Sequence, residues 1–393
     1  MKLCVLTSRF PYPIEKGDKL RIYHQLRMLS QKHHITLIAL TDQPVAEEDL
    51  RHMQAFLEEI HIFPIKKWSL PFFLAKAYLK GDPLQVAYFY RPKIHQKIRQ
   101  IIDDLQPDHI YCQLIRMAAY VRDIPLPKTL DYMDCFSAGM ARQAEEGPTW
   151  QAGIYHRESR LLFAYQQAVY DDFTFHTIIS EQDRKLLDPA GKRNIQIVPN
   201  GIDTTYFQPS PKHPRASIAF VGNMGYFPNV KAADYLVKKI MPYVWKTDPN
   251  QTVIIAGARP TPQVLALAKD PRVEVTGWVE DIRDAYLAGK VFVAPIFTGS
   301  GQQNKILEAM AMGRPCFTTP LVNNAIEAIP GQEIEIADRP ELFAQQILRL
   351  LGDPAAYATR VQASRYFVEA YMNWARAVET LEQNFSGMPS PQD

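Results

Sequence analysis

Apolar and polar positions alternate along this chain with two different spacings. Short apolar runs, typical of buried strands, are separated by longer stretches in which apolar residues recur at helical spacing, as in DKLRIYHQLRMLSQKH. Such alternation predicts βαβ units and parallel sheets flanked by helices. In the first half of the chain the apolar runs cover 2–8, 35–41, 109–115, 175–180 and 195–199.

A break in this pattern lies at 201–216, GIDTTYFQPSPKHPRA, which holds three prolines and few apolar residues. Beyond it the strand–helix rhythm restarts and continues to an amphipathic stretch at about 357–385, which we expect to form one terminal helix. We therefore predict an α/β protein of two Rossmann-like domains, 1–205 and 206–360, followed by a helix and tail in 361–393. In the second half, strands are expected at 216–223, 251–257, 273–277 and 291–297, and helices at 230–246, 262–270 and 282–289.

Composition narrows the class of protein without defining an activity. With 47% apolar residues, 22% charged residues and a net charge of +2, the chain gives no reason to expect a nucleic-acid partner. The first apolar run is too short for a signal-peptide core, and no 18 apolar residues follow one another. We expect a cytoplasmic protein with reduced cysteines, because Cys4, Cys112, Cys135 and Cys316 lack the spacing of a zinc site.

The stretch TGSGQQNKILEAMAMGRP, 298–315, is the strongest candidate for chemistry. It follows the apolar run VFVAPIF and has the outline of strand, glycine loop and helix. Gly299 and Gly301 permit a sharp turn and a close backbone approach, and the helix N-terminus beyond them suits an anion. Lys305 adds positive charge, and Glu308 follows on the same helix face, where it can accept hydrogen bonds from ribose hydroxyls. This pairing favours a nucleotide.

Other phosphate motifs fit this stretch poorly. The dinucleotide fingerprint needs a third glycine where Asn304 stands and an acid after the next strand, which reads CFTTPLVNN. The G-x-x-x-x-G-K-[ST] loop is also absent. A structural interpretation stays open, in which the glycines form a plain turn and Lys305 and Glu308 form a solvated salt bridge.

Four sequence blocks in order along the chain carry a resemblance to a known family. VPNGID, FVGNM, TGWVEDI and the pattern G-x-G-x-x-x-K-x-x-E-A-M-A-x-G-R-P together resemble the retaining glycosyltransferases of family 4. The resemblance implies a GT-B fold, with two Rossmann-like domains facing a central cleft and a final helix, around Trp374, that crosses back to the first domain. It implies a hexosyltransferase that moves a sugar from a nucleoside-diphosphate sugar to a glycan or lipid-linked acceptor in polysaccharide or glycoconjugate synthesis.

The resemblance also assigns roles to individual positions. Two departures stand out, because Ser300 replaces the first glutamate of the family's E-x7-E motif, and Asn223 replaces a phosphate-binding arginine. Lys231 either compensates for that arginine or is a solvated lysine. The implied roles are Asp134 and Lys305 in catalysis; Gly17, Asn223, Gly301, Gln302 and Lys305 at the donor diphosphate; Glu308 at the ribose; Gly299 and Ser300 at the donor sugar; and Trp278 and Val279 at the nucleobase.

The first domain offers weaker candidates. Asp18 either belongs to the site or is the N-cap of the helix that follows Gly17. Lys19 and Arg21 either contact phosphate or acceptor or are exposed helix charges. Asp134, and less so Asp131, would meet the acceptor, with an N-cap role for Asp134 equally open. Met133 stands near the position of the family's catalytic histidine.

No D-x-D motif is present, so we expect a metal-independent enzyme with no cofactor beyond its donor substrate. The segment 64–97 mixes lysines with aromatic residues and suits peripheral contact with the inner face of an anionic membrane, unless its aromatics fill the core and its lysines are solvated. Two other classes stay open. One is another GT-B enzyme, such as a nucleotide-sugar epimerase or a phosphorylase, and the other is a non-catalytic GT-B binding protein.

Overall fold

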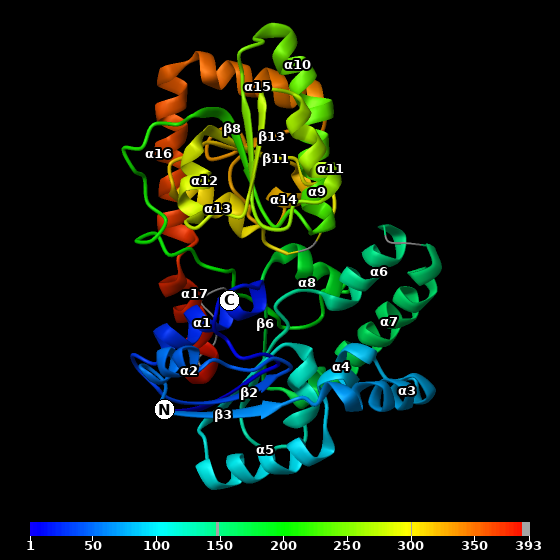
Figure 1. Ribbon diagram of the computed structural model, residues 1–393. Helices are drawn as coiled ribbons and strands as arrows, with labels where there is room; N and C mark the ends of the chain where they lie inside the picture. The colour runs from blue at the N-terminus through cyan, green and yellow to red at the C-terminus, as the bar shows by residue number, and fades with distance from the viewer. Residues whose placement is uncertain (147–148, 300, 387–393) are drawn as a thin grey trace. The chain divides into compact units, whose positions relative to one another are not determined.

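The computed structural model describes residues 1–146, 149–299 and 301–386 (Figure 1). Its contacts divide the chain into two compact units, residues 1–199 together with the segment from Trp374, and residues 200–373. Each unit is a parallel sheet flanked by helices, which confirms the predicted α/β class with two Rossmann-like parts. The divisions follow residues 199 and 373, whereas the sequence suggested 205 and 360. No helix in the described ranges is long and apolar enough to span a membrane.

The first unit is built on a seven-stranded parallel sheet in the order β3-β2-β1-β4-β5-β6-β7. Strand β1 is central and pairs with β2 on one side and β4 on the other, so the strand order reverses there. The loops after the carboxyl ends of such strands meet at one edge of the sheet, which is where α/β proteins bind ligands. The strands are β1 (Lys2–Thr7), β2 (His34–Thr41), β3 (Glu59–Pro64), β4 (His109–Gln113), β5 (Lys128–Asp131), β6 (Phe175–Ile178) and β7 (Gln196–Ile197).

Helices cover both faces of this sheet (Figure 1). One core cluster gathers around Cys4, Leu6 and Ile110, and the other around Leu3, Val5 and Leu37. The helices are α1 (Gly17–Leu29), α2 (Glu47–Gln54), α3 (Leu70–Lys80), α4 (Leu84–Phe89), α5 (Pro92–Leu105), α6 (Phe136–Glu146), α7 (Thr149–Ala168) and α8 (Glu181–Leu187).

The C-terminal segment is two helices rather than the one predicted over 357–385. Helix α16 (Pro354–Tyr371) belongs to the second unit, and α17 (Trp374–Ser386) to the first. The helix stops because the carbonyl of Met372 accepts a hydrogen bond from Ile202 N at 2.7 Å, and Asn373 pairs with Ile202 as a parallel bridge. Beyond the break, the Trp374 ring stacks on His24 at 4.8 Å between centroids, and Leu381 is fully buried in the first unit. The return of the final helix to the first unit is thus as expected.

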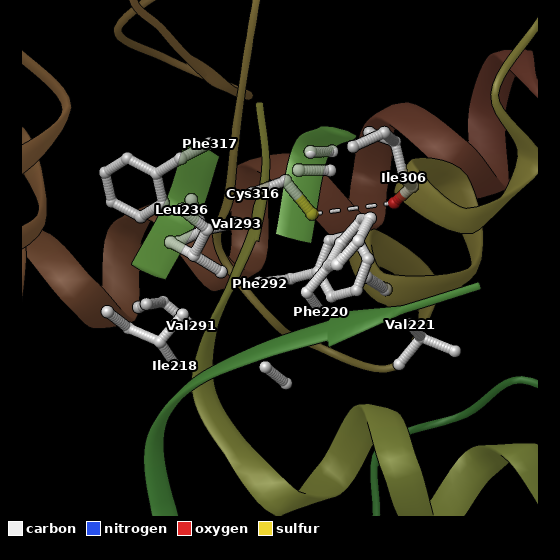
Figure 2. Packing of buried hydrophobic residues seen from close by; sticks show 14 of the residues in the cluster. Ile218, Phe220, Val221, Leu236, Val291, Phe292, Val293, Ile306, Cys316 and Phe317 are labelled. Carbon is white, nitrogen blue, oxygen red and sulfur yellow. Dashed lines mark hydrogen bonds between the residues drawn. The ribbon is translucent and has the colours of Figure 1, made fainter. Parts of the chain in front are cut away.

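The second unit has a six-stranded parallel sheet in the order β10-β9-β8-β11-β12-β13. Its core packs aromatic and branched side chains of β8 and β11 against the covering helices, as Figure 2 shows for Phe220, Phe292 and Leu236. The strands are β8 (Ala216–Val221), β9 (Val253–Ala256), β10 (Val273–Gly277), β11 (Gly289–Ala294), β12 (Cys316–Thr318) and β13 (Glu335–Ile336). The helices are α9 (Phe227–Tyr235), α10 (Met241–Thr247), α11 (Pro262–Leu265), α12 (Ile282–Ala288), α13 (Asn304–Ala311), α14 (Pro320–Asn323), α15 (Pro340–Gly352) and α16.

The strand order of this sheet also reverses, between β8 and β11. The loops after these two strands therefore open at the same edge, and the glycine loop is one of them. At that edge two backbones touch, because a Cβ on Gly257, whose φ is +140°, would lie 1.7 Å from the carbonyl oxygen of Gly222. Only glycine permits this approach, which fixes the loop after β8 beside the end of β9.

Candidate functional site

The glycine loop connects β11 to α13 with left-handed backbone at its glycines. Gly299 has a φ of +128° and Gly301 a φ of +71°, conformations that favour glycine over any other residue. A Cβ on Gly301 would meet no atom within 4 Å, so the backbone there borders open space. Ser300, assigned to the donor sugar by resemblance, lies outside the described residues.

Free backbone N–H groups gather where this loop becomes α13. Four backbone N–H groups within five residues donate to no acceptor in the described part of the chain. Orphan amides at a helix N-terminus, together with the helix dipole, attract an anion such as a diphosphate. These amides belong to Gly301, Gln302, Asn304 and Lys305.

The side chain of Gln302 holds this loop in place while its own backbone N–H stays free. Gln302 is buried, its Nε2 donates to Asn200 O at 3.0 Å, and its Oε1 accepts from Asn200 N at 3.0 Å. Asn200 Nδ2 also donates to Asn304 Oδ1 at 3.3 Å. The loop is therefore fastened to the VPNGID block, which explains how two blocks a hundred residues apart contribute to one site.

Lys305 is a half-buried cation without a carboxylate partner among the described residues. Its Nζ donates to Oδ1 of Asn229, and Asn229 Nδ2 donates to Asn223 O at 3.0 Å. Gly222 leaves room for this arrangement, since a Cβ there would lie 3.1 Å from Lys305 Nζ and 2.8 Å from Asn229 Nδ2. Burial lowers the pKa of Lys305 to about 8, against the opposing effect of Glu308. The site thus holds an ammonium group that a ligand anion would stabilise.

Glu308 lies one turn further along α13, and its partner is Tyr286 rather than Lys305. The fully buried Tyr286 donates its hydroxyl hydrogen to Glu308 Oε2, and no ion pair joins Lys305 and Glu308 in the described structure. The salt bridge that the sequence left open is therefore not formed. Burial raises the pKa of Glu308, while the Tyr286 hydrogen bond and the Lys305 charge lower it. Among the described residues none donates to Glu308 Oε1, which can therefore accept from a hydroxyl group.

The remaining candidates of this unit border the same edge of the sheet. Asn223 is exposed and its Oδ1 accepts from Gly225 N at 3.0 Å, so it shapes the loop after β8. Lys231 is exposed, with its Nζ 4.4 Å from the ring centroid of Phe227. Trp278, directly after β10, is 71% exposed, whereas its neighbour Val279 packs against the core. An exposed indole ring is suited to stacking on a base.

In the first unit the structure brings Gly17 and the loop after β5 together. A Cβ on Gly17 would lie 3.3 Å from Met133 Cε, so only a glycine-sized residue fits there without displacement. Met133 has a φ of +64°, which is uncommon for a residue other than glycine. Strained backbone of this kind is concentrated at functional sites.

Asp134 is placed next to Met133 in an environment that disfavours its charge. Its Oδ1 is buried and has no hydrogen-bond partner among the described residues. Burial raises the pKa of Asp134 to about 7, with a further increase from Asp183, while Arg116 and Arg142 lower it. Helix α6 begins at Phe136 and is preceded by Cys135, so Asp134 is not the N-cap that the sequence left open. A carboxyl group that titrates near neutrality can serve as a general base.

Three expectations for the first unit were wrong. Arg21 is neither a ligand contact nor an exposed charge, because it is fully buried and donates Nε to Asp131 Oδ2 at 2.8 Å and Nη2 to Oδ1 at 3.0 Å. Asp131 is thereby occupied and does not face an acceptor. Asp18 is not an N-cap, since α1 begins at Gly17 after Lys16, and Asp18 pairs with Arg9 instead.

Lys19, the remaining charge of that group, is half-buried, and burial lowers its pKa. Sequence reasoning missed Tyr286 and Asn229, which fix the two charged side chains of the second unit. Each stands in an ordinary amphipathic stretch, IRDAYLAG and FPNVKAADY, where nothing distinguishes it from a core or surface residue. Only the contacts of the folded chain single them out.

Two Rossmann-like units, one with a glycine loop at the switch point of its sheet, define the GT-B class of architecture. Residues 215–353 match the family model described as glycosyl transferases group 1. A protein described as an uncharacterized 44.6 kDa protein in the cps region of Klebsiella pneumoniae is 21% identical over 366 residues, 88% of this chain and 90% of its own length.

Solved structures show the same fold over nearly the whole chain. Sucrose-phosphate synthase from Thermosynechococcus elongatus is similar with a TM-score of 0.71, at 15% identity, covering 98% of this chain and 99% of its own. Anabaena HepE in complex with UDP and glucose has a TM-score of 0.66 at 14% identity, covering 98% of this chain and 99% of its own. TarM of S. aureus has a TM-score of 0.68 at 9% identity, covering 98% of this chain and 100% of its own. The chain thus has the fold of GT-B glycosyltransferases, and its residues 215–353 match the group 1 model.

Proposed function

We propose that this protein is a retaining glycosyltransferase that moves a hexose from a nucleoside-diphosphate sugar to a glycan or lipid-linked acceptor. The observation that carries the proposal is the geometry around α13. A half-buried ammonium without a carboxylate partner in the described structure lies beside free helix amides, and an acidic side chain follows one turn later. This combination is what a diphosphate joined to a ribose requires.

The proposed catalysis depends on stabilising the negative charge that develops on the leaving diphosphate. When the bond from the sugar to the diphosphate breaks, negative charge accumulates on the departing phosphate oxygens. Lys305 and the amides of Gly301 and Gln302 would stabilise that charge without having to reorganise, because the side chain of Gln302 already fixes the loop. Retention in this scheme needs no strong protein nucleophile.

The other roles complete the donor site of the proposal. Glu308 would accept from the ribose hydroxyls, with Tyr286 holding its other oxygen. Gly299 and Ser300 would border the sugar, and Trp278 with Val279 would contact the base. In the first unit, Asp134 would take the proton of the acceptor hydroxyl.

Similar proteins support the choice of substrates. Anabaena HepE was solved with UDP-glucose, and S. aureus TarM with UDP and α-GlcNAc-glycerol. The Klebsiella relative is described by its place in the cps region. We therefore propose a uridine nucleotide as the first donor to test and polysaccharide or glycoconjugate synthesis as the process. We further propose metal-independent turnover in the cytoplasm, at the inner face of the membrane when the acceptor is lipid-linked.

Calorimetry against UDP, GDP and ADP and their common sugars tests the donor. Donor hydrolysis by the wild type, and its loss in Lys305→Ala and Glu308→Ala variants, would support the site and count against a non-catalytic binding protein. Nuclear magnetic resonance of the product reports its anomeric configuration, and an inverted anomer would refute retention. Interconversion of the donor sugar without any transfer would instead indicate an epimerase. Full activity in both variants would show that the site assignment is wrong.

A further inference from the structure

Helix α3 belongs to the first unit (Figure 1). This helix and the turn before it expose a stripe of apolar side chains. Trp68 is 80% exposed, Phe72 68% and Leu79 86%, and the exposed Ala75 stands between the last two. Their spacing of four, three and four residues places them along one face of the helix. The sequence alternative in which these aromatics fill the core is therefore wrong for Trp68 and Phe72.

The opposite face of α3 is also apolar, and it is the face that packs on the unit. Ala77 is buried, Leu70 packs against the core, and Phe73 is half-buried with the Arg91 guanidinium 4.1 Å from its ring centroid. A surface helix normally has one apolar face turned to the core and one polar face turned to water. Because α3 has apolar side chains on both, its outer face needs an explanation beyond folding.

Exposed lysines without an ion-pair partner in the described part of the chain lie beside this outer face. Lys66, Lys67, Lys76 and Lys80 are all exposed, and none forms an ion pair with any described residue. The neighbouring α4, LQVAYF, carries no charge, and α7 contributes Arg157, whose guanidinium lies 4.2 Å from the Tyr78 ring centroid. The acid of this segment, Asp82, follows the helix.

We propose that this face docks on an anionic membrane surface. We call it the α3 surface; it consists of Lys66, Lys67, Trp68, Phe72, Lys76, Leu79 and Lys80. Aromatic and aliphatic side chains would enter the interface between headgroups and acyl chains while the lysines meet anionic headgroups. A second copy of the chain is a poorer occupant, because a two-fold contact would set the lysines of one α3 surface against those of the other.

The test is flotation of the full chain with vesicles, without donor or acceptor. We expect binding to vesicles of mixed phosphatidylcholine and phosphatidylglycerol, weak binding to pure phosphatidylcholine, and loss of binding as salt is raised. Trp68→Ser/Phe72→Ser should weaken binding more than tenfold. Lys76→Gln/Lys80→Gln should weaken it roughly thirtyfold, at about one kcal/mol for each lysine near the surface.

Matched variants in the second unit serve as controls. Leu265→Ser/Tyr366→Ser removes two exposed apolar side chains, and Lys246→Gln/Lys269→Gln removes two exposed lysines, both with no expected change. Circular dichroism should show every variant folded. The proposal is overturned if the wild type ignores anionic vesicles, or if the α3 variants bind like the controls. Sedimentation showing a dimer that Trp68→Ser/Phe72→Ser dissolves would assign the surface to self-association instead.

This proposal stands independently of glycosyl transfer, although membrane docking would bring the protein to a lipid-linked acceptor. An assay of donor hydrolysis in solution tests glycosyl transfer separately from membrane docking. If the α3 variants hydrolyse donor normally but no longer float, docking is supported and the donor site is unaffected. If the wild type floats but never turns over donor, the proposed function fails while the docking surface remains.

Discussion

Replacing Lys305 by methionine should make the unliganded protein more stable while impairing its donor site. Burial lowers the pKa of this lysine from 10.5 to about 8, so keeping it protonated in the folded state costs about 3 kcal/mol. Methionine removes that cost but leaves Oδ1 of Asn229 without its donor, which costs about 1–2 kcal/mol. We expect a net gain of roughly 1–2 kcal/mol, or a few degrees in Tm, at neutral pH.

The pH dependence of this gain has a definite sign. Below pH 8, Lys305 is protonated in both folded and unfolded states, so the burial cost is present in full. Between pH 8 and 10.5 the unfolded state binds more protons than the folded state, and the stability of the wild type rises relative to the variant. Thermal unfolding at pH 7 and at pH 10 should therefore show a difference between the two proteins that shrinks as pH rises.

Nucleotide binding by the Lys305→Met variant should weaken, although its stability should increase. Losing a charge-assisted contact to the diphosphate should weaken nucleotide binding about tenfold to a hundredfold and lower kcat/KM by about two orders of magnitude. Lys290→Met is the matched control, because Lys290 is an exposed lysine on β11, at the opposite end of that strand from the glycine loop. A Lys305→Met variant that is less stable than the wild type at pH 7, or that binds nucleotide equally well, would refute this reasoning.

Three further predictions concern the other proposed roles. Calorimetry with the nucleotide and its deoxyribose analogue should show that Glu308→Gln abolishes the discrimination between the two ligands and that Tyr286→Phe reduces it about fivefold. Equal discrimination by the wild type and both variants would exclude a ribose contact. The activity of the wild type should rise with pH through about 7, because Asp134 acts only when deprotonated, whereas Asp134→Asn should be at least a hundredfold slower with no such rise. Dialysis against EDTA should leave the rate unchanged, and restoration of a lost rate by Mg²⁺ would contradict metal-independent turnover.

Much of the fold could be predicted from local patterns. Buried parallel strands read as short apolar runs, and β1, β2, β8, β9 and β11 all overlap runs that the sequence shows. Strand β3 was missed because HIFP and its neighbours are only half-buried, which weakens their apolar signal. The break between α16 and α17 was missed because it depends on the pairing of Ile202 with residues 372–373, a contact far apart in sequence.

The candidate site likewise combines local features, which the sequence predicts, with contacts between residues far apart in sequence, which it does not. The left-handed glycines, the helix N-terminus and the one-turn spacing of Lys305 and Glu308 are local properties, so the sequence alone could place them. The partners of these side chains are not local. Whether Lys305 bonds to Glu308 or to Asn229 depends on how α9 packs beside α13.

For this protein, the sequence alone determined the α/β alternation, the glycine loop and the residue types available to hold a diphosphate. Tertiary structure decided which charges are free. It buried Arg21 against Asp131, left Lys305 without a carboxylate partner among the described residues, and turned Trp68 and Phe72 outward with the lysines around them. The physical reason is that periodicity records which face of an element is apolar, whereas the protonation and pairing of a side chain depend on neighbours that only the folded chain brings near.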